Sequence, residues 1–501
     1  MMMKHLLKVS SMFSDHMVIQ RNKPVHVRGV SSPGKTISVS LQDKKKNVIA
    51  GSNGEWFAAF PALPAGGPFS ITVSDGESTI VLKDILAGDV WVCSGQSNME
   101  MPLKDSKDAE KEISQAEFPL IRHCRIPQLA SDVPVPEIEC KWETCTPETS
   151  GQFTAVGYFF ARHVHLEAGI PIGLLNSSWG GSEIEPWIPS DVFKDRRFKI
   201  LLDRQNDALA KNNLKRHALS THCNAMVHAL ASFPIKGFLW YQGESNACWA
   251  ESYAKLFPAM IKSWRHAWHD GKLPFYFVQL AGFGTEKNIQ ENISWPELRE
   301  AQAETLRLKN TGMAVAIDVG EADNIHPRNK QEVGRRLALL ALSNTYNAEL
   351  HSKSKEVFKQ PIDRRVKTRH TFNKITISMI AKQYKVKCPC MSPSYARHRI
   401  AKSAVEIFFK DVGKGLCGGN GGKASGFSIA GKDRVFVDAE ARIEKKNVVR
   451  VSSSLVPKPF AVRYAWTGCP DCNLMNSAGL PAVPFRTDRW PLATKGRMWP
   501  D

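Results

Sequence analysis

Residues 89–100, DVWVCSGQSNME, decide the fold of this 501-residue chain. A short run of apolar and β-branched residues ends at Gly95, and Ser97 follows it in a tight turn. This pattern predicts a buried strand that carries Ser97 to the carboxyl edge of an open α/β sheet, where such sheets place their ligands. Taken alone, the pattern Gly-x-Ser-Asn is weak, because it also occurs in ordinary turns.

Strand and helix patterns alternate from about residue 89 to residue 347. The expected strands lie at 235–241, 275–280 and 314–319, and the expected helices at 155–168, 253–269, 297–308 and 331–344. Such alternation predicts a parallel sheet that is covered by helices on both faces.

The flanking regions have β character. Short alternating runs at 25–30, 36–41 and 69–73, separated by Gly and Pro, predict an antiparallel sandwich near the N-terminus. Strands are expected again at 404–409, 434–437, 448–451 and 461–466. We therefore expect an N-terminal β-sandwich (1–87), an α/β domain (88–347), a basic insert or linker (348–403) and a C-terminal β region (404–501).

The net charge of +18 is concentrated in one segment. Residues 352–410 contain 15 Lys and Arg against 3 Asp and Glu, a net of +12, which leaves 18 − 12 = +6 for all other residues. The segment is therefore expected to be a solvated loop rather than a sign of a nucleic-acid partner. A patch for nucleic acid or acidic glycans, and non-native sequence from a faulty gene model, are the alternatives.

Membrane insertion is not expected, because no stretch approaches the roughly 20 apolar residues that a spanning helix needs. The first ten residues have too short an apolar run for a signal peptide, so the compartment is left open. The 11 cysteines do not define a disulfide framework. A zinc site built from Cys388, Cys390, Cys469 and Cys472 is an alternative to inert or partly disulfide-bonded thiols, which we favour.

A second motif, Asp323-Asn-Ile-His326-Pro, supplies the chemistry that Ser97 lacks. A serine hydroxyl becomes a useful nucleophile only when a base takes its proton, and that base needs an anion to orient it. Residues three apart in one helical turn share a face, so Asp323 can hold one imidazole nitrogen while the other faces Ser97. The alternative is an ordinary surface turn.

Two further motifs predict an oxyanion hole. Gly180 and Gly181 follow an apolar run at 172–175, and paired glycines let backbone N–H groups approach a substrate oxygen closely. Gln242, Glu244 and Asn246 follow the expected strand at 235–241. For each motif the alternative is a loop whose polar groups are satisfied internally.

Taken together, these motifs resemble the sialate O-acetylesterase family within the SGNH hydrolases. The segments that carry the resemblance are 95–102, 179–182, 242–246 and 323–327, in the family's order, and 12–20 and 478–488 resemble its first strand and closing segment. The resemblance implies a flavodoxin-like central domain and a serine esterase that hydrolyses O-acetyl esters on carbohydrates, with sialic acid as the name-giving substrate. No metal or organic cofactor is implied.

The resemblance also assigns roles. Ser97 is expected to be the nucleophile, His326 the general base and acid, and Asp323 the residue that orients it. The oxyanion hole would comprise the Ser97 and Gly181 N–H groups and a side chain, Gln242 being favoured over Asn246.

Substrate contacts and rival functions remain open at this point. Glu244 is a candidate substrate-binding residue, and Trp187 is a candidate for stacking on a sugar or, equally, a core residue. An esterase for acetylated xylan or another glycan is one alternative, and a catalytically idle glycan-binding protein is another. The oligomeric state is not indicated.

Overall fold

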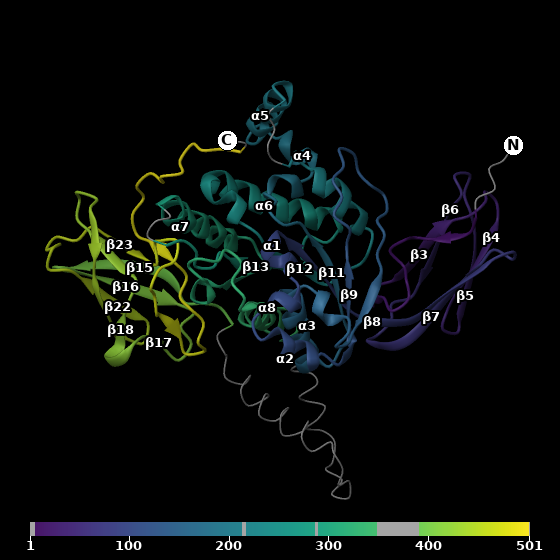
Figure 1. Ribbon diagram of the computed structural model, residues 1–501, viewed down its shortest axis with the longest axis horizontal. Coiled ribbons are helices and arrows are strands. Elements are labelled where there is room, and N and C mark those ends of the chain that lie inside the picture. The colour runs from purple at the N-terminus through teal and green to yellow at the C-terminus, as the bar shows by residue number, and fades with distance from the viewer. Residues whose placement is uncertain (1–5, 213–216, 286–288, 348–389, 500–501) are drawn as a thin grey trace, which may run out of the picture.

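The computed structural model describes the chain except for residues 1–5, 213–216, 286–288, 348–389 and 500–501. A large mixed sheet with helices on it forms the centre of the molecule (Figure 1). The N-terminal strands lie at one end of the long axis, and the C-terminal sheets lie at the other. The expected α/β class is therefore confirmed at this level.

The central sheet has the strand order β10-β9-β11-β8-β12-β13-β14. All neighbours are parallel except β10, which is antiparallel to β9. The strands are β8 (Thr79–Gly95), β9 (Phe118–Arg125), β10 (Trp142–Cys145), β11 (Ile172–Ser178), β12 (Gly237–Tyr241), β13 (Phe275–Gln279) and β14 (Thr311–Val315). Every residue of β11, β12 and β13 is buried, which explains their nearly continuous apolar sequences.

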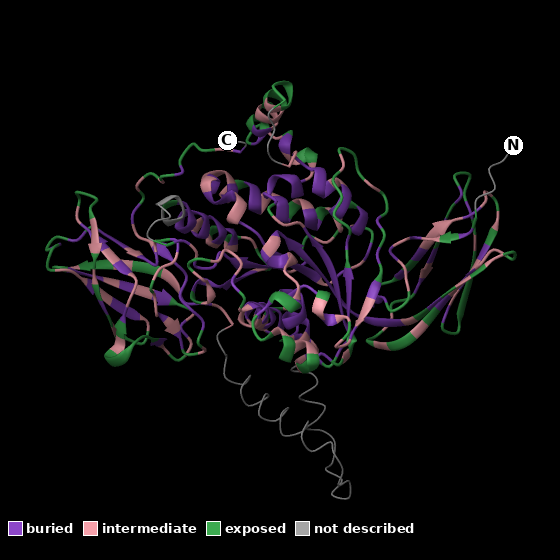
Figure 2. Cartoon of the chain, viewed as in Figure 1, coloured by how far each residue is buried: buried purple, intermediate pink, exposed green. Residues whose placement is uncertain are grey.

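Helices cover both faces of this sheet, and buried residues concentrate between sheet and helices (Figure 2). Trp91 and Cys93 of β8 belong to one core cluster with α3 (Ala155–Ala168) and α8 (Lys330–Asn344). Val90 and Val92, which point the other way, join the cluster that contains α6 (Ala250–Ala267). The remaining helices are α1 (Ser97–Glu100), α2 (Ala109–Ser114), α4 (Ser190–Phe193), α5 (Lys199–Ala210) and α7 (Ile289–Glu304).

One strand of the expected sheet ends early. The pattern at 314–319 predicted a strand, but β14 ends at Val315 and residues 317–319 form a single 3-10 turn. A Cβ at Gly320 would lie 2.2 Å from the carbonyl oxygen of Gly282, so the chain here presses against a neighbouring loop instead of continuing the sheet.

The N-terminal strands form two groups. β1 (Lys8–Val9), β3 (Val25–Val30) and β6 (Glu55–Phe60) make one sheet. β2 (Val18–Gln20), β4 (Thr36–Leu41), β5 (Lys44–Ile49) and β7 (Gly66–Ser74) connect to the first half of β8. Because β8 is one continuous strand, the expected boundary at residue 87 falls inside it, and the division into domains stays a prediction.

The C-terminal strands begin earlier than expected. β15 (Ser394–Ala401) lies within the range 348–403 that was assigned to an insert or linker, which corrects that assignment for these residues. β15 is the edge strand of its sheet and exposes Arg397 and Arg399. Charged edge strands are common because the charges discourage pairing with other chains. Here the charged residues made the segment look like part of the basic insert, so the sequence did not predict a strand. Residues 348–389, the larger part of the expected insert, lie outside the described residues.

The other C-terminal strands form small antiparallel sheets. They are β16 (Ala404–Lys410), β17 (Leu416–Cys417), β18 (Lys423–Ala424), β19 (Phe427–Ala430), β20 (Phe436–Asp438), β21 (Glu440–Lys445), β22 (Val448–Ser452), β23 (Ala461–Tyr464), β24 (Met475–Asn476) and β25 (Phe485–Arg486).

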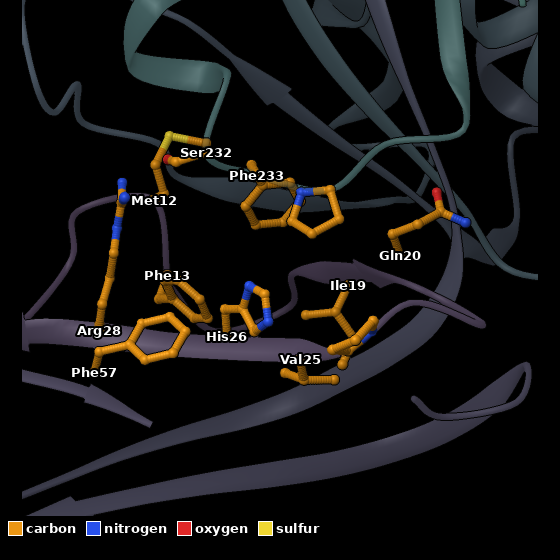
Figure 3. Close-up of a pocket in the computed structure, with 12 residues that line it drawn as sticks. Met12, Phe13, Ile19, Gln20, Val25, His26, Arg28, Phe57, Ser232 and Phe233 are labelled. Atoms are coloured by element: carbon orange, nitrogen blue, oxygen red, sulfur yellow. The ribbon is translucent and has the colours of Figure 1, made fainter. Parts of the chain in front are cut away.

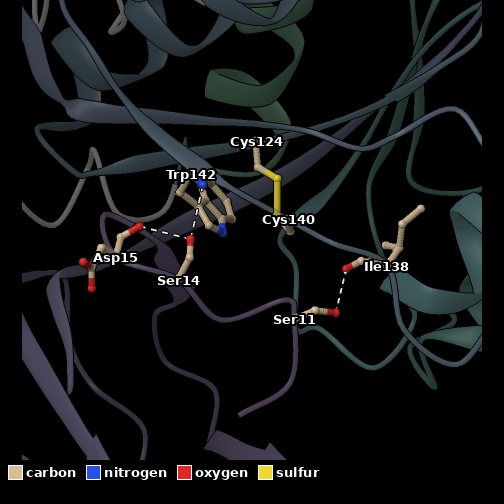
Figure 4. The surroundings of a disulfide bond; sticks show 7 residues. All are labelled: Ser11, Ser14, Asp15, Cys124, Ile138, Cys140 and Trp142. Carbon is tan, nitrogen blue, oxygen red and sulfur yellow. Dashed lines mark hydrogen bonds between the residues drawn. A yellow bond between two sulfur atoms is a disulfide. The ribbon is translucent and has the colours of Figure 1, made fainter. Parts of the chain in front are cut away.

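A disulfide joins Cys124 of β9 to Cys140, just before β10 (Figure 4). Ser11 and Ser14 of the N-terminal segment bond to Ile138 O and to Trp142 N beside it. Cys469 and Cys472 form no disulfide with another described residue, and Cys388 lies outside the described residues, so the four-thiolate alternative stays untested. Within the described part of the chain no cluster of His, Cys, Asp and Glu is arranged to hold a metal, and no helix could span a bilayer.

A cavity of about 210 Å³ lies between the N-terminal strands and the segment 232–234 (Figure 3). Phe13, His26, Phe57 and Phe233 line it, and the rings of His26 and Phe57 lie 5.0 Å apart. None of the expected site residues reaches it, so it is separate from the region around Ser97.

Candidate active site

Three of the sequence motifs leave the central sheet at one edge. Gly95, the last residue of β8, is in register with Ser178 at the end of β11 and with Tyr241 at the end of β12. The loops at 96–102, 179–182 and 242–246 therefore start side by side. Parallel strands that end in register explain why motifs far apart in sequence meet here.

Backbone hydrogen bonds around Gly95 link these loops to one another. Gly95 ends β8, the Gln96 N–H donates to Tyr241 O (3.0 Å), and the Gly95 carbonyl accepts from the Trp179 N–H (3.0 Å). With φ at +134°, Gly95 has a backbone that other residues rarely adopt, and a Cβ there would lie 2.1 Å from Tyr241 O. Only glycine allows the turn that presents Ser97.

Ser97 and His326 are in direct contact. The Oγ of Ser97, the first residue of α1, lies 2.8 Å from His326 Nε2. The His326 N–H donates to Asn324 Oδ1 (3.0 Å), which fixes the turn that carries the imidazole. Burial lowers the pKa of His326, and the positive charge of Lys330 lowers it further. The imidazole is thus kept neutral and able to accept the Ser97 proton.

Asp323 is not part of this contact. It lies exposed on the surface, and among the described residues its carboxylate forms no hydrogen bond with His326. The spacing placed both residues in one turn, as expected, but their side chains do not meet in this structure.

The loop with Gly180 and Gly181 lies against Ser97. A Cβ built on Gly180 would lie 3.5 Å from Ser97 Cβ, and the Gly180 N–H donates to Glu100 Oε2 (2.7 Å). Gly181 has φ at +75° and is exposed. Within the described part of the chain, the backbone N–H groups of Ser97 and Gly181 have no hydrogen-bond acceptor. Both remain available to a substrate oxygen.

Gln242 and Asn246 are used in a different way from the one expected. Both are fully buried, and Gln242 Nε2 donates to Ser182 O (3.2 Å) and to Asn246 Oδ1 (2.7 Å). Asn246 Oδ1 also accepts from Ile184 N, while its Nδ2 donates to Glu185 Oε2. The Gln242 Nε2 and both polar atoms of the Asn246 side chain bond to residues 182–185 or to each other, so these amides hold the loop after Gly181 and do not face solvent.

Of the two candidate substrate contacts, Trp187 is buried and Glu244 is half-buried. Trp187 is fully buried, and its indole N–H donates to Ser182 Oγ (3.0 Å), so the structure favours the core alternative over sugar stacking. Glu244 accepts a hydrogen bond from Asn98 Nδ2 at 2.5 Å, and its other carboxylate oxygen is buried. Burial raises the pKa of Glu244.

Sequence reasoning missed several residues that surround Ser97. Asn98 and Lys330 are buried and bonded to each other, and Glu100 binds the Gly180 N–H, Arg125 and Gln128. No signal singles out Lys330, because the run 328–332 is entirely polar. Trp179 is half-buried beside Gly180 and stacks on His222 with ring centroids 4.4 Å apart. Being partly exposed, it is a better candidate than Trp187 for stacking on a sugar.

A groove of about 440 Å³ lies next to the loop that carries His326. It is lined by residues of 107–108, 319–321 and 328–329, and neither Ser97 nor His326 forms part of its wall. It therefore borders the candidate site without containing the Ser97–His326 pair.

The chain is similar to known carbohydrate esterases. A family model described as carbohydrate esterase, sialic acid-specific acetylesterase, matches residues 87–343. The sialate O-acetylesterase of Homo sapiens is 30% identical over 377 residues, which cover 68% of this chain and 71% of the human protein. The Mus musculus sialate O-acetylesterase is 31% identical over 401 residues, covering 68% and 73%.

The similarity extends to a solved structure. A carbohydrate acetylesterase from Xanthomonas citri is 35% identical, with a TM-score of 0.81, over 96% of this chain and 100% of its own. Fold and matches together define the class: this chain is a carboxylic ester hydrolase that acts on carbohydrates. It belongs to the sialic acid-specific acetylesterase family of carbohydrate esterases, which confirms the family expected from the motifs.

Proposed function

We propose that this chain removes acetyl groups from O-acetylated sialic acid through an acetyl-enzyme formed on Ser97. The observation that carries the proposal is the 2.8 Å contact between Ser97 Oγ and His326 Nε2 at the carboxyl edge of the sheet. A neutral imidazole in that position can take the hydroxyl proton as the oxygen attacks.

The reaction has two half-reactions. Ser97 Oγ attacks the acetyl carbonyl carbon while its proton passes to His326 Nε2, and the bond from that carbon to the sugar oxygen then breaks as His326 returns the proton to the sugar. A water molecule next attacks the acetyl-enzyme, giving its proton to His326. The bond to Ser97 Oγ breaks, Oγ regains the proton, and acetic acid leaves and ionises to acetate by losing a proton to solvent.

The developing oxyanion would be stabilised by the Ser97 and Gly181 N–H groups. Support comes from their lack of acceptors among the described residues and from the closeness of Gly180 to Ser97. Gln242 and Asn246, expected as side-chain donors, are proposed instead to fix the loop that presents Gly181.

Asp323 is proposed as the orienting anion, on the strength of the family resemblance alone. Its exposed carboxylate would have to turn toward His326 Nδ1, which a residue three positions away in the same turn can reach by rotation about its side-chain bonds. If Asp323 acts in this way, Asp323→Asn lowers kcat without raising KM.

The central domain is proposed to have the flavodoxin-like arrangement of SGNH hydrolases. The order β11-β8-β12-β13-β14 supports this, because in chain order it reads 2-1-3-4-5, with β9 added beyond β11. The switch point of that order lies between β8 and β12, and β8 is the strand that ends at Ser97's turn.

The choice of sialic acid rests on the names of the two mammalian relatives, and an acetylated xylan or another acetylated glycan is the alternative. The test is acetate release from a panel comprising an O-acetylated sialoside, acetylated xylan and an acetylated monosaccharide, each with the wild type and Ser97→Ala. We expect the highest kcat/KM for the sialoside and none for Ser97→Ala. A preference for xylan would contradict the substrate, and full activity of Ser97→Ala would contradict the mechanism.

A further inference from the structure

A polar cluster with two buried members and one half-buried member adjoins the Ser97–His326 pair and takes no part in the steps above. It consists of Asn98, Glu244 and Lys330, which come from α1, from the loop after β12 and from the start of α8. Lys330 is fully buried and Asn98 is 1% exposed. Burying an ammonium lowers the stability of the fold unless the group is paired and hydrogen-bonded. A buried lysine at this place therefore suggests a role in function.

Lys330 joins the serine side of the site to the histidine side. Its Nζ donates to Asn98 Oδ1 (2.6 Å), next to Ser97 in α1, and to Pro327 O (2.7 Å), next to His326. The same ammonium lies 5.5 Å from the centre of the Tyr241 ring, at the end of β12. One side chain thus contacts groups that adjoin both members of the pair.

Asn98 completes the link from the other direction. Its Nδ2 donates to Ile325 O (2.9 Å) and to Glu244 Oε1 (2.5 Å). The carbonyls of Ile325 and Pro327, which flank His326 on both sides, are therefore each held by a member of this cluster. Asn324 Oδ1 holds the His326 N–H, and the cluster holds the carbonyls on either side of it, so both fix the backbone that carries the imidazole.

We propose that Lys330, acting through Asn98 and Pro327, is a positioning residue that holds His326 at reacting distance from Ser97, with Glu244 as its counter-ion. This inference rests on the proposed function, because it presupposes that Ser97 and His326 react. Lys330 touches neither the acetyl group nor the sugar; it acts through the two loops that carry the pair.

The charge of Lys330 gives the proposal a second observable. The charged and titratable groups around it are Glu244, Glu321, Tyr241 and His326, and the two carboxylates favour its ammonium form. Burial nevertheless lowers the pKa of Lys330 to about 7. In its charged form Lys330 lowers the pKa of His326, so removing the charge of Lys330 should raise the pKa of His326.

The test compares Lys330→Met and Asn98→Ala with Ser97→Ala and with Lys262→Met, a change of the same kind at an exposed position of α6. The substrate is 4-nitrophenyl acetate, which has no sugar, and a fluorophosphonate probe reports the reactivity of Ser97. We expect Lys330→Met to lower kcat and the labelling rate by about 10- to 100-fold with KM little changed, because misplacing a reacting group costs rate rather than binding. Lys262→Met should match the wild type.

The pH profile separates positioning from general support of the fold. In Lys330→Met the acid limb of kcat/KM should move to higher pH, whereas in Asn98→Ala, which keeps the charge, it should stay in place while kcat still falls. Asn98→Ala also carries the test if Lys330→Met does not fold.

The outcomes are distinguishable. If Ser97→Ala is inactive but Lys330→Met and Asn98→Ala keep wild-type kcat and labelling, the positioning role is wrong while the proposed function stands. A folded Lys330→Met with reduced kcat but an unmoved acid limb also contradicts the role given to the charge. If Ser97→Ala keeps full activity, both proposals fail.

Discussion

The imidazole of His326 is half-buried, and its surroundings set the pH range in which Ser97 can react. Burial first, and the charge of Lys330 second, lower its pKa below the ordinary value of 6.5. Only the neutral ring can accept the Ser97 proton, so we expect kcat/KM to be retained at pH 6.5 and lost as the pH falls through the lowered pKa. A pH profile whose acid limb lies at or above 6.5 would contradict this.

The pairing of Ser97 with His326 was predictable because both motifs carry turn residues at fixed positions. Gly95 can adopt the positive φ that the turn before Ser97 needs, and Pro327 follows His326 at the end of its turn. The backbone path of both turns could therefore be expected from these residue types. The directions of Gln242, Asn246 and Trp187 were not predictable, because a polar or aromatic residue after a strand can turn inward or outward. Lys330 gave no sign of burial within its polar run.

At the scale of elements, the packing of α8 on α3 determines where the loop that carries His326 ends. Gly334 of α8 packs so closely on α3 that a Cβ there would lie 2.5 Å from Phe159 Cβ and 2.8 Å from Phe160 N. The sequence predicted α3 with its observed bounds, because Thr154 caps it and Gly169 ends it in a left-handed conformation. The closeness of the two helices, in contrast, depends on a tertiary contact that no local pattern encodes.

We expect Gly334→Ala to lower the free energy of unfolding by about 1–3 kcal/mol through overpacking, which the helix propensity of alanine offsets only in part. Because α8 starts at Lys330, kcat should fall as well. Thermal unfolding and acetate release measure the two effects. Gly271→Ala is the matched control, since a Cβ there meets no atom within 4 Å. Equal stability of the two variants would show that α8 adjusts freely.

At the scale of the whole molecule, Arg299 connects the central and C-terminal regions. The guanidinium of Arg299 is fully buried and donates to the carbonyls of Leu280 and Ala281 after β13 and of Thr467 and Gly468 after β23. Burial lowers the pKa of Arg299 to about 10, so it stays charged at neutral pH. The sequence indicated a C-terminal β region but not this link, because a single arginine in a helix is usually a surface residue.

Replacing Arg299 with methionine should lower the free energy of unfolding by about 3 kcal/mol, because buried carbonyls lose a charged donor. Chemical unfolding followed by intrinsic fluorescence measures the change. Arg307→Met is the control, since the Arg307 side chain is 81% exposed and forms an i, i+3 ion pair with Glu304. An Arg299→Met protein as stable as this control would mean that Arg299 is not needed to hold the C-terminal sheets in place.

The central claim is that Ser97 is the nucleophile that His326 activates. Its most direct test is peptide mass spectrometry of the protein after inactivation by a fluorophosphonate, with residual acetate release followed in parallel. We predict that the probe's mass appears on the peptide containing Ser97 in proportion to the activity lost, and that His326→Ala labels far more slowly. Complete inactivation with the label on another residue, and Ser97 unmodified, would contradict the account.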